Sequence, residues 1–267
     1  EAMARDRLGI RSVSLPSPER VRIEISTKPE AASEADLILF CVKTIDTDGA
    51  ASQIAPHLRP SAIVVDLQNG VDNPERLRRA GIDPIPAVVF VAAAVERPGE
   101  VTHRGRGDLV IGHPARPDDV RRVKGWFEAA GVPCRVADDI DRELWIKLIL
   151  NSMTNAISAL TGKPYGQVAR FGPTWEIALE VAREAAATAR AEGHEFDRDE
   201  LAETCREICL GIRDATSSTE QDVARGRPTE IDSLNGFIAR RGEAAGVPTP
   251  VNHALHALVK LRERTGD

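Results

Sequence analysis

Residues 36–67, DLILFCVKTIDTDGAASQIAPHLRPSAIVVDL, contain two short apolar runs on either side of a segment with helical character. Apart from Asp36 and Asp66, the runs 36–42 and 62–67 are continuously hydrophobic, as strands are in a parallel sheet that is covered on both faces. Residues 47–58 between them provide the helix that a crossover between parallel strands requires. The stretch therefore predicts a strand–helix–strand unit of an α/β domain.

The alternation of strands and helices continues on both sides of this unit. In chain order, the further expected elements are a helix end at 1–8, strands at 10–13, 21–25 and 86–92, a hairpin of 100–103 and 108–112 around Gly105-Arg106-Gly107, a helix at 120–130 and a strand at 134–136. This order predicts a Rossmann-like, doubly wound α/β domain over residues 1–137.

The character of the sequence changes after Asp138. Strand patterns stop, and helical patterns follow one another at 141–160, 173–192, 197–215, 230–245 and 250–264. An all-α domain is therefore expected over residues 138–267.

The start of the α/β domain lacks an expected feature. A dinucleotide-binding domain ordinarily opens with a strand and a glycine-rich turn, whose backbone amides receive the pyrophosphate. No such turn occurs in this sequence. Either the sequence omits the front of the domain, or the protein lacks ordinary cofactor affinity. The first interpretation is favoured, because a sheet without its central strand leaves backbone groups unpaired.

Composition excludes several classes of protein. The formal net charge of −6 argues against a nucleic-acid-binding protein, and no apolar run is long enough to span a bilayer. The four cysteines match neither a zinc site nor a disulfide framework, and the chain opens on a polar stretch without the pattern of a signal peptide. We therefore expect a cytoplasmic protein with no membrane or nucleic-acid partner. No metal site is expected either, since the histidines lie apart from cysteines and carboxylates at ligand spacing.

The strongest local feature is a polar stripe in an apolar helical segment. Lys147, Asn151 and Asn155 are spaced i, i+4 and i+8, so they share one helix face among Leu, Ile, Met and Trp neighbours. Only six of the 35 basic residues are lysines, so a lysine in this setting suggests a need for an ammonium group. Either the stripe is a buried hydrogen-bond ladder, or it faces a ligand.

Weaker signals lie at the ends of predicted elements. Thr229 and Asp232 are typical of helix capping, whereas Glu230 is not explained by a capping box. Lys43 and the run Gln68-Asn69-Gly70 follow two predicted strands, where open α/β sheets bind their ligands.

Taken together, these motifs resemble the 2-dehydropantoate 2-reductase (ketopantoate reductase) family. The resemblance covers nearly the whole chain in the right order. Its motifs are Val42-Lys43, QNGVxN at 68–73, WxKLxxNxxxN at 145–155, SSxxQD at 217–222, TEIDxxNG at 229–236 and GxPTPxN at 246–252.

The resemblance implies roles for two catalytic residues. Lys147 matches the general acid that protonates the carbonyl oxygen as hydride arrives from NADPH. Glu230 matches the carboxylate that holds the substrate hydroxyl and tunes the lysine. Such roles are chemically sensible, because an ammonium both stabilises a developing alkoxide and donates its proton.

The resemblance also implies binding residues. Asn151 and Asn155 match amides that bind the substrate, and Ser218 matches a serine that contacts its carboxylate. Asn69 matches the residue that places nicotinamide and substrate. Lys43 matches a residue that contacts the cofactor. Asn69 and Glu230 are also expected to bind the cofactor.

The implied activity is reduction of ketopantoate to (R)-pantoate with NADPH, in pantothenate and coenzyme A biosynthesis. The choice of NADP over NAD comes from the family, because the glycine turn and the residue that reads the 2′-phosphate would lie upstream of Glu1. Two alternatives stay open: a related reductase of another 2-ketoacid, and a non-catalytic relative with the same fold. The intact Lys147 and Glu230 argue against the latter. A homodimer is expected only by analogy with other helical second domains.

Overall fold

The computed structural model describes residues 7–264. Contacts divide the chain into two compact units, one of Glu1–Gln68 and Asn73–Ile140, the other of Asn69–Asp72 and Asp141–Asp267. The first holds a mixed sheet with helices and the second is helical. The predicted fold class, a Rossmann-like α/β region followed by an all-α region, is confirmed.

The first unit is built on a seven-stranded sheet with the order β2-β1-β6-β5-β4-β3, in which β7 also pairs with β6. β3, β4 and β5 run parallel, β5 and β6 run antiparallel, and β6 is parallel to both β1 and β7. The strands are β1 (Leu8–Ser12), β2 (Glu19–Val21), β3 (Leu37–Phe40), β4 (Ile63–Asp66), β5 (Ile85–Arg97), β6 (Glu100–Ile111) and β7 (Cys134–Val136).

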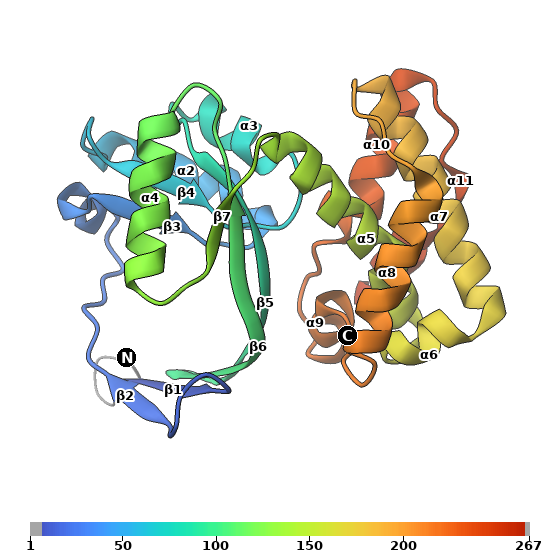
Figure 1. Cartoon of the computed structure of the whole chain (residues 1–267), viewed down its shortest axis with the longest axis horizontal. Helices are drawn as coiled ribbons and strands as arrows, with labels where there is room; N and C mark the ends of the chain where they lie inside the picture. The colour runs from blue at the N-terminus through green and yellow to red at the C-terminus, as the bar shows by residue number, and fades with distance from the viewer. Residues whose placement is uncertain (1–6, 265–267) are drawn as a thin grey trace. The chain divides into compact units, whose positions relative to one another are not determined.

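Helices cover both faces of the parallel part of this sheet, as the continuous apolar runs predict (Figure 1). Alternation along β4 sends Ile63 and Val65 to one face, where they pack with Val123 and Phe127 of α4 (Pro117–Ala129). Val64 points to the other face, into a cluster with α2 (Thr47–Ile54) and α3 (Asn73–Arg79).

The front of the chain differs in detail from the prediction. Of the expected helix end at 1–8, residues 1–6 lie outside the described residues and Leu8 begins β1. The crossover helix ends at Ile54, and a 3-10 turn follows at Ala55–His57. Pro56 explains this early end, because its ring cannot continue the hydrogen bonding of an α-helix.

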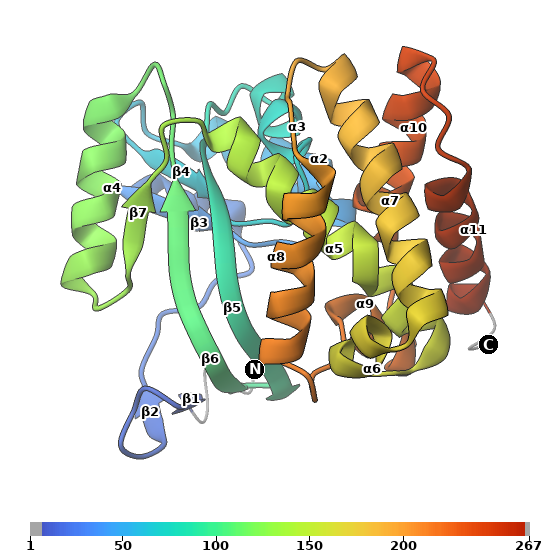
Figure 2. The same ribbon diagram turned by 45° about the vertical axis from the view of Figure 1, so that its right-hand side comes forward.

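The predicted hairpin around Gly105-Arg106-Gly107 is wrong. Residues 100–111 form the single strand β6, which pairs with β5 along most of its length (Figure 2). The chain turns at Pro98-Gly99 instead, and Gly99 has a φ of 82°. Proline followed by glycine suits the two central positions of a type II turn.

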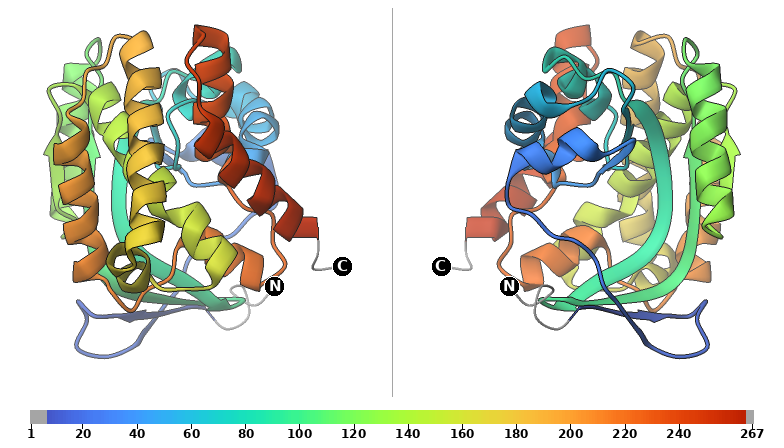
Figure 3. Two further views of the ribbon diagram at one scale, coloured as in Figure 1. Left: turned by 90° about the vertical axis from the view of Figure 1, so that its right-hand side faces the viewer. Right: turned by 90° about the vertical axis from the view of Figure 1, so that its left-hand side faces the viewer.

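The Gly-Arg-Gly run serves as an irregular, bulged part of β6. The pairing register with β5 shifts between Phe90 and Val91 and again between Ala92 and Ala93, opposite this run. Arg106 and Gly107 have φ values of 56° and 126°, so the extended ladder is interrupted without reversing the chain. Bulges bend strands, and both views in Figure 3 show the curvature of this pair.

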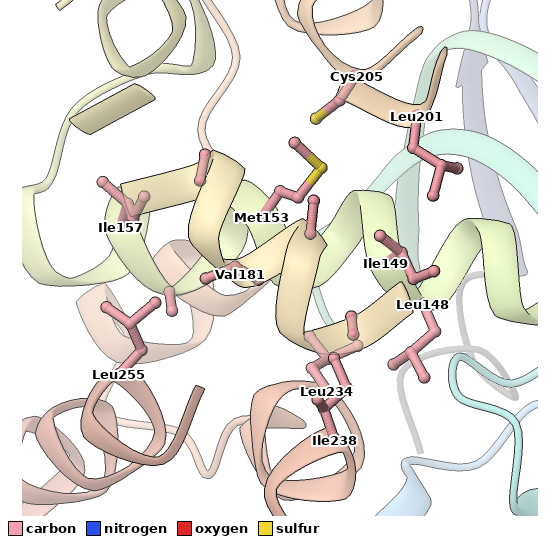
Figure 4. Close-up of a cluster of buried hydrophobic side chains, with 14 of the residues drawn as sticks. Leu148, Ile149, Met153, Ile157, Val181, Leu201, Cys205, Leu234, Ile238 and Leu255 are labelled. Carbon is pink, nitrogen blue, oxygen red and sulfur yellow. The ribbon is translucent and has the colours of Figure 1, made fainter. Parts of the chain in front are cut away.

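The second unit is organised around one long helix, α5 (Ile140–Thr161). Leu148, Ile149, Met153 and Ile157 of this helix are buried and belong to a core shared with the neighbouring helices (Figure 4). Those neighbours are α6 (Tyr165–Arg170), α7 (Gly172–Ala191), α8 (Arg198–Gly211), α9 (Ser218–Ala224), the 3-10 turn η4 (Ile231–Ser233), α10 (Asn235–Ala245) and α11 (Pro250–Arg264). Among the described residues, no helix is long and apolar enough to cross a membrane.

Candidate active site

One face of α5 carries the predicted polar stripe. Lys147, Asn151 and Asn155 all lie within this helix, four residues apart, which is a rise of about 6 Å per step. Lys147 and Asn151 are partly exposed, whereas Asn155 is buried. The stripe thus runs from an accessible end toward the interior of the helical unit.

Asn155 is held firmly at the buried end of the stripe. The hydroxyl of Tyr165 donates a hydrogen bond to Asn155 Oδ1 over 2.9 Å. Burial raises the pKa of Tyr165 far above its ordinary value, so this hydroxyl stays protonated and donates. The contact orients the amide of Asn155, as the ladder interpretation of the stripe requires; its part in substrate binding stays a prediction.

Ser218 is placed by its neighbour Ser217. The Ser217 hydroxyl donates to the Asn155 carbonyl oxygen over 3.1 Å and accepts from the Glu220 amide, so it caps α9 while binding α5. Ser218 is the first residue of α9 and is exposed. The capping residue of the Ser-Ser pair is therefore the first serine, which leaves the second to face solvent.

Glu230 contacts another predicted site residue. Asn69 Nδ2 donates to Glu230 Oε2 over 3.2 Å, although the two residues are 161 positions apart. Both side chains are partly buried. The turn that carries Asn69 needs Gly70, whose φ is 104°. The segment Asn69–Asp72 groups with the helical unit, so this contact lies within one compact unit.

The loop that carries Glu230 is also tied to α5. Asn235, at the start of α10, donates through Nδ2 to the Ser152 carbonyl oxygen and to Asn252 Oδ1, each over 3.0 Å. All three residues are fully buried. The tie brings α10, which begins five residues after Glu230, against the middle of the helix that carries Lys147.

Residues of α11 that the motifs did not indicate hold the Glu230 loop from the other side. Thr229 is not the N-cap of η4, because that position is Glu230, which makes no side-chain capping bond; the Thr229 hydroxyl oxygen accepts from the Ile231 amide over 3.2 Å and closes a local turn. Asp232 instead binds His256 and Lys260 of α11. His256 lies in the body of α11. The four-residue spacing of His256 and Lys260 is the signal that could have found this contact.

The α/β unit offers groups that fit a dinucleotide at the carboxyl ends of β3 and β4. Lys43 follows β3 and is exposed. Gln68 follows β4 and donates to the Val42 carbonyl oxygen and to Thr47 Oγ1, each over 2.8 Å. Gln68 Oε1 is buried and accepts no hydrogen bond. A cation for a phosphate and an acceptor for an amide or hydroxyl match the chemistry of such a cofactor.

Comparison with known proteins agrees with this architecture. The family described as "Ketopantoate reductase PanE/ApbA" matches residues 1–116, and "Ketopantoate reductase PanE/ApbA C terminal" matches residues 139–263. A 2-dehydropantoate 2-reductase of Pyrobaculum aerophilum is 35% identical over 87% of this chain and 79% of its own length.

Solved structures give the same result. The PanE/ApbA family ketopantoate reductase from Ralstonia eutropha JMP134 superposes with a TM-score of 0.92 at 43% identity, over 99% of this chain and 87% of that one. A dimeric ketopantoate reductase from Staphylococcus aureus has a TM-score of 0.83 at 19% identity, over 97% and 88% of the two chains, a likeness that shows the fold alone.

The fold and these matches define the class of protein as a two-domain oxidoreductase with a Rossmann-like unit. More specifically, the chain belongs to the ketopantoate reductase family, and the resemblance seen in its motifs is confirmed.

Proposed function

We propose that this protein reduces 2-dehydropantoate (ketopantoate) to (R)-pantoate with NADPH, a step of pantothenate and coenzyme A biosynthesis. The named activity of the relatives supports the proposal. The single observation that carries it is the hydrogen bond between Asn69 and Glu230. It joins two residues that the family motifs assign to the site from opposite ends of the sequence.

Lys147 acts as the general acid in this proposal. Bound NADPH supplies a hydride to the carbonyl carbon of the substrate. As negative charge develops on the carbonyl oxygen, the Lys147 ammonium stabilises it and transfers a proton to it, which leaves a neutral amine that solvent reprotonates. Arginine could not replace this function, because it does not release its proton at accessible pH.

Polar side chains of the helical unit bind and orient the substrate. Glu230 accepts a hydrogen bond from the substrate hydroxyl, and Asn69 fixes the orientation of the Glu230 carboxylate. The exposed Ser218 hydroxyl donates to the substrate carboxylate, and Asn151 and Asn155 contribute amides that can donate or accept. Asn151, Asn155 and Ser218 project from helices, whose fixed backbone favours a fixed substrate geometry.

We assign NADP binding to residues 1–137, with Lys43 as a contact, and substrate binding and dimerisation to residues 138–267. Asn69 and Glu230 would contact both cofactor and substrate. We also propose a homodimer, as the S. aureus protein is described. All four cysteines are free thiols, three of them buried, which fits a place in the reducing cytoplasm.

Oxidation of NADPH by the purified full-length protein tests the reaction. We expect turnover with ketopantoate, followed as loss of NADPH absorbance, and a kcat/KM at least about 10-fold lower with 2-ketoacids that lack the hydroxyl, since an unpaired Glu230 carboxylate is costly. Turnover of another 2-ketoacid, with no turnover of ketopantoate, would instead identify a different reductase of this family. No turnover of any 2-ketoacid would contradict the proposal.

Replacing Glu230 with alanine is expected to weaken substrate binding. We expect KM for ketopantoate to rise about 10-fold or more, because the carboxylate accepts a charge-assisted hydrogen bond from the substrate hydroxyl. Steady-state kinetics measure this change. Glu243→Ala, which removes an exposed carboxylate from α10, is the matched control. Unchanged KM and kcat in Glu230→Ala would remove Glu230 from the site.

A further inference from the structure

One face of α11 binds the loop residues on both sides of Glu230. His256, Lys260 and Glu263 are spaced i, i+4 and i+7, so they project from the same face of this helix. On the C-terminal side of Glu230, Asp232 binds two of them. Its carboxylate oxygens lie 2.6 Å from His256 Nε2 and 3.1 Å from Lys260 Nζ.

Glu263 holds the residue on the N-terminal side of Glu230. Its Oε1 accepts from the Thr229 amide over 3.0 Å and also from the Thr229 hydroxyl. Its Oε2 lies 2.7 Å from Lys260 Nζ, so Lys260 bridges Glu263 and Asp232. Glu230 therefore sits between two residues that are fixed to one helix.

Burial distinguishes the Glu263 contact from an ordinary surface ion pair. The Glu263 side chain is 12% exposed and Thr229 is 5% exposed, whereas the Asp232 side chain is 50% exposed. Hydrogen bonds from a backbone amide and a hydroxyl to a carboxylate are strong when solvent is largely excluded. Exposed pairs such as Lys260–Asp232 contribute little by comparison.

Gly236 allows α11 to approach this closely. A methyl group at this position would lie 2.8 Å from His256 Cδ2 and 3.1 Å from the Ile231 carbonyl oxygen. Both atoms belong to the contact between α11 and the Glu230 loop. The arrangement is therefore a tightly packed one, in which the loop has little freedom to change its direction.

We propose that Glu263 is a positioning residue for Glu230. By fixing the amide and hydroxyl of Thr229, it sets the backbone direction from which the Glu230 side chain projects toward Asn69 and the substrate hydroxyl. Glu263 itself contacts no substrate. The proposal rests on the proposed function, because the role of Glu230 in substrate binding is part of it. Displacing such a group by a fraction of an ångström weakens productive binding.

Kinetics of Glu263 variants, alone and combined with Glu230→Ala, test this role. We expect Glu263→Ala to raise KM for ketopantoate about 5-fold with a smaller change in kcat, and Glu263→Gln, which keeps an acceptor for Thr229, to recover most of the loss. In the Glu230→Ala background, Glu263→Ala should change KM less than about 2-fold, since its effect passes through Glu230. A purely structural role would lower activity in both backgrounds.

Two controls keep the result interpretable. Glu243→Ala should leave KM unchanged, and circular dichroism should show that each variant is folded. If Glu263→Ala does not fold, Thr229→Val removes the hydroxyl contact while keeping the backbone amide, and the same KM pattern is expected. An unchanged KM in these variants, or effects that add in the Glu230→Ala background, would overturn the role of Glu263 alone. No turnover by the unsubstituted protein would overturn the proposed function, and this role with it.

Discussion

Replacing Lys147 with alanine is expected to lower kcat for ketopantoate by about 100-fold or more, the usual contribution of a general acid. The substitution removes both the proton donor and the positive charge beside the developing alkoxide. KM should change much less than kcat, because the ammonium acts mainly in the transition state. Steady-state NADPH oxidation at saturating ketopantoate measures the effect.

Two further substitutions separate chemistry from structure. Lys147→Arg keeps the charge but does not release a proton, so it should remain well below the unsubstituted kcat. Lys163→Ala removes an exposed lysine just beyond the end of α5 and should leave kcat unchanged. A near-normal kcat in Lys147→Ala would exclude this lysine as the acid.

Replacing Glu184 with alanine is expected to reduce the free energy of unfolding by about 3 kcal/mol, because it leaves buried donors without an acceptor. Glu184 lies on α7 and is fully buried. Its carboxylate accepts from the Val251 and Asn252 amides, each over 2.9 Å, and from Asn252 Nδ2 over 2.8 Å. It thereby caps α11, where unpaired amides and the helix dipole favour a negative charge.

Chemical denaturation followed by circular dichroism measures this loss. Glu176→Ala, which removes an exposed carboxylate two turns earlier on α7, is the matched control and should change the free energy by less than about 0.5 kcal/mol. Glu184→Gln should lie between the two, because one oxygen still accepts from an amide. If Glu184→Ala matched the control, the capping of α11 by this carboxylate would be contradicted.

Most of the fold could be predicted because its signals are local. The apolar runs in β3 and β4 and the helical period of α5 and α11 are visible in short windows of sequence. The hairpin predicted from residues 100–103 and 108–112 is wrong for the same reason. Gly105-Arg106-Gly107 looks like a turn locally, and only pairing with β5 makes it a bulge.

Part of the candidate site could be predicted as well. Lys147, Asn151 and Asn155 share a helix face, and that follows from their spacing alone. The motif indicated that Glu230 belongs to the site, but it did not indicate which residues position the Glu230 loop. Asn69 binds Glu230 directly, and Glu263 holds the loop through Thr229. Both partners are distant from the loop in sequence, and no periodicity links them to it.

By itself, the sequence indicated an α/β region followed by a helical one, the polar stripe of α5 and the family to which the chain belongs, because each depends on neighbouring residues or on motifs. Only the tertiary structure decided which polar groups meet. Asn69 reaches Glu230, Glu263 reaches Thr229, and the buried Glu184 caps α11. The physical reason is that a buried polar group must find a partner, and packing, rather than the local sequence, determines which groups come within hydrogen-bonding distance.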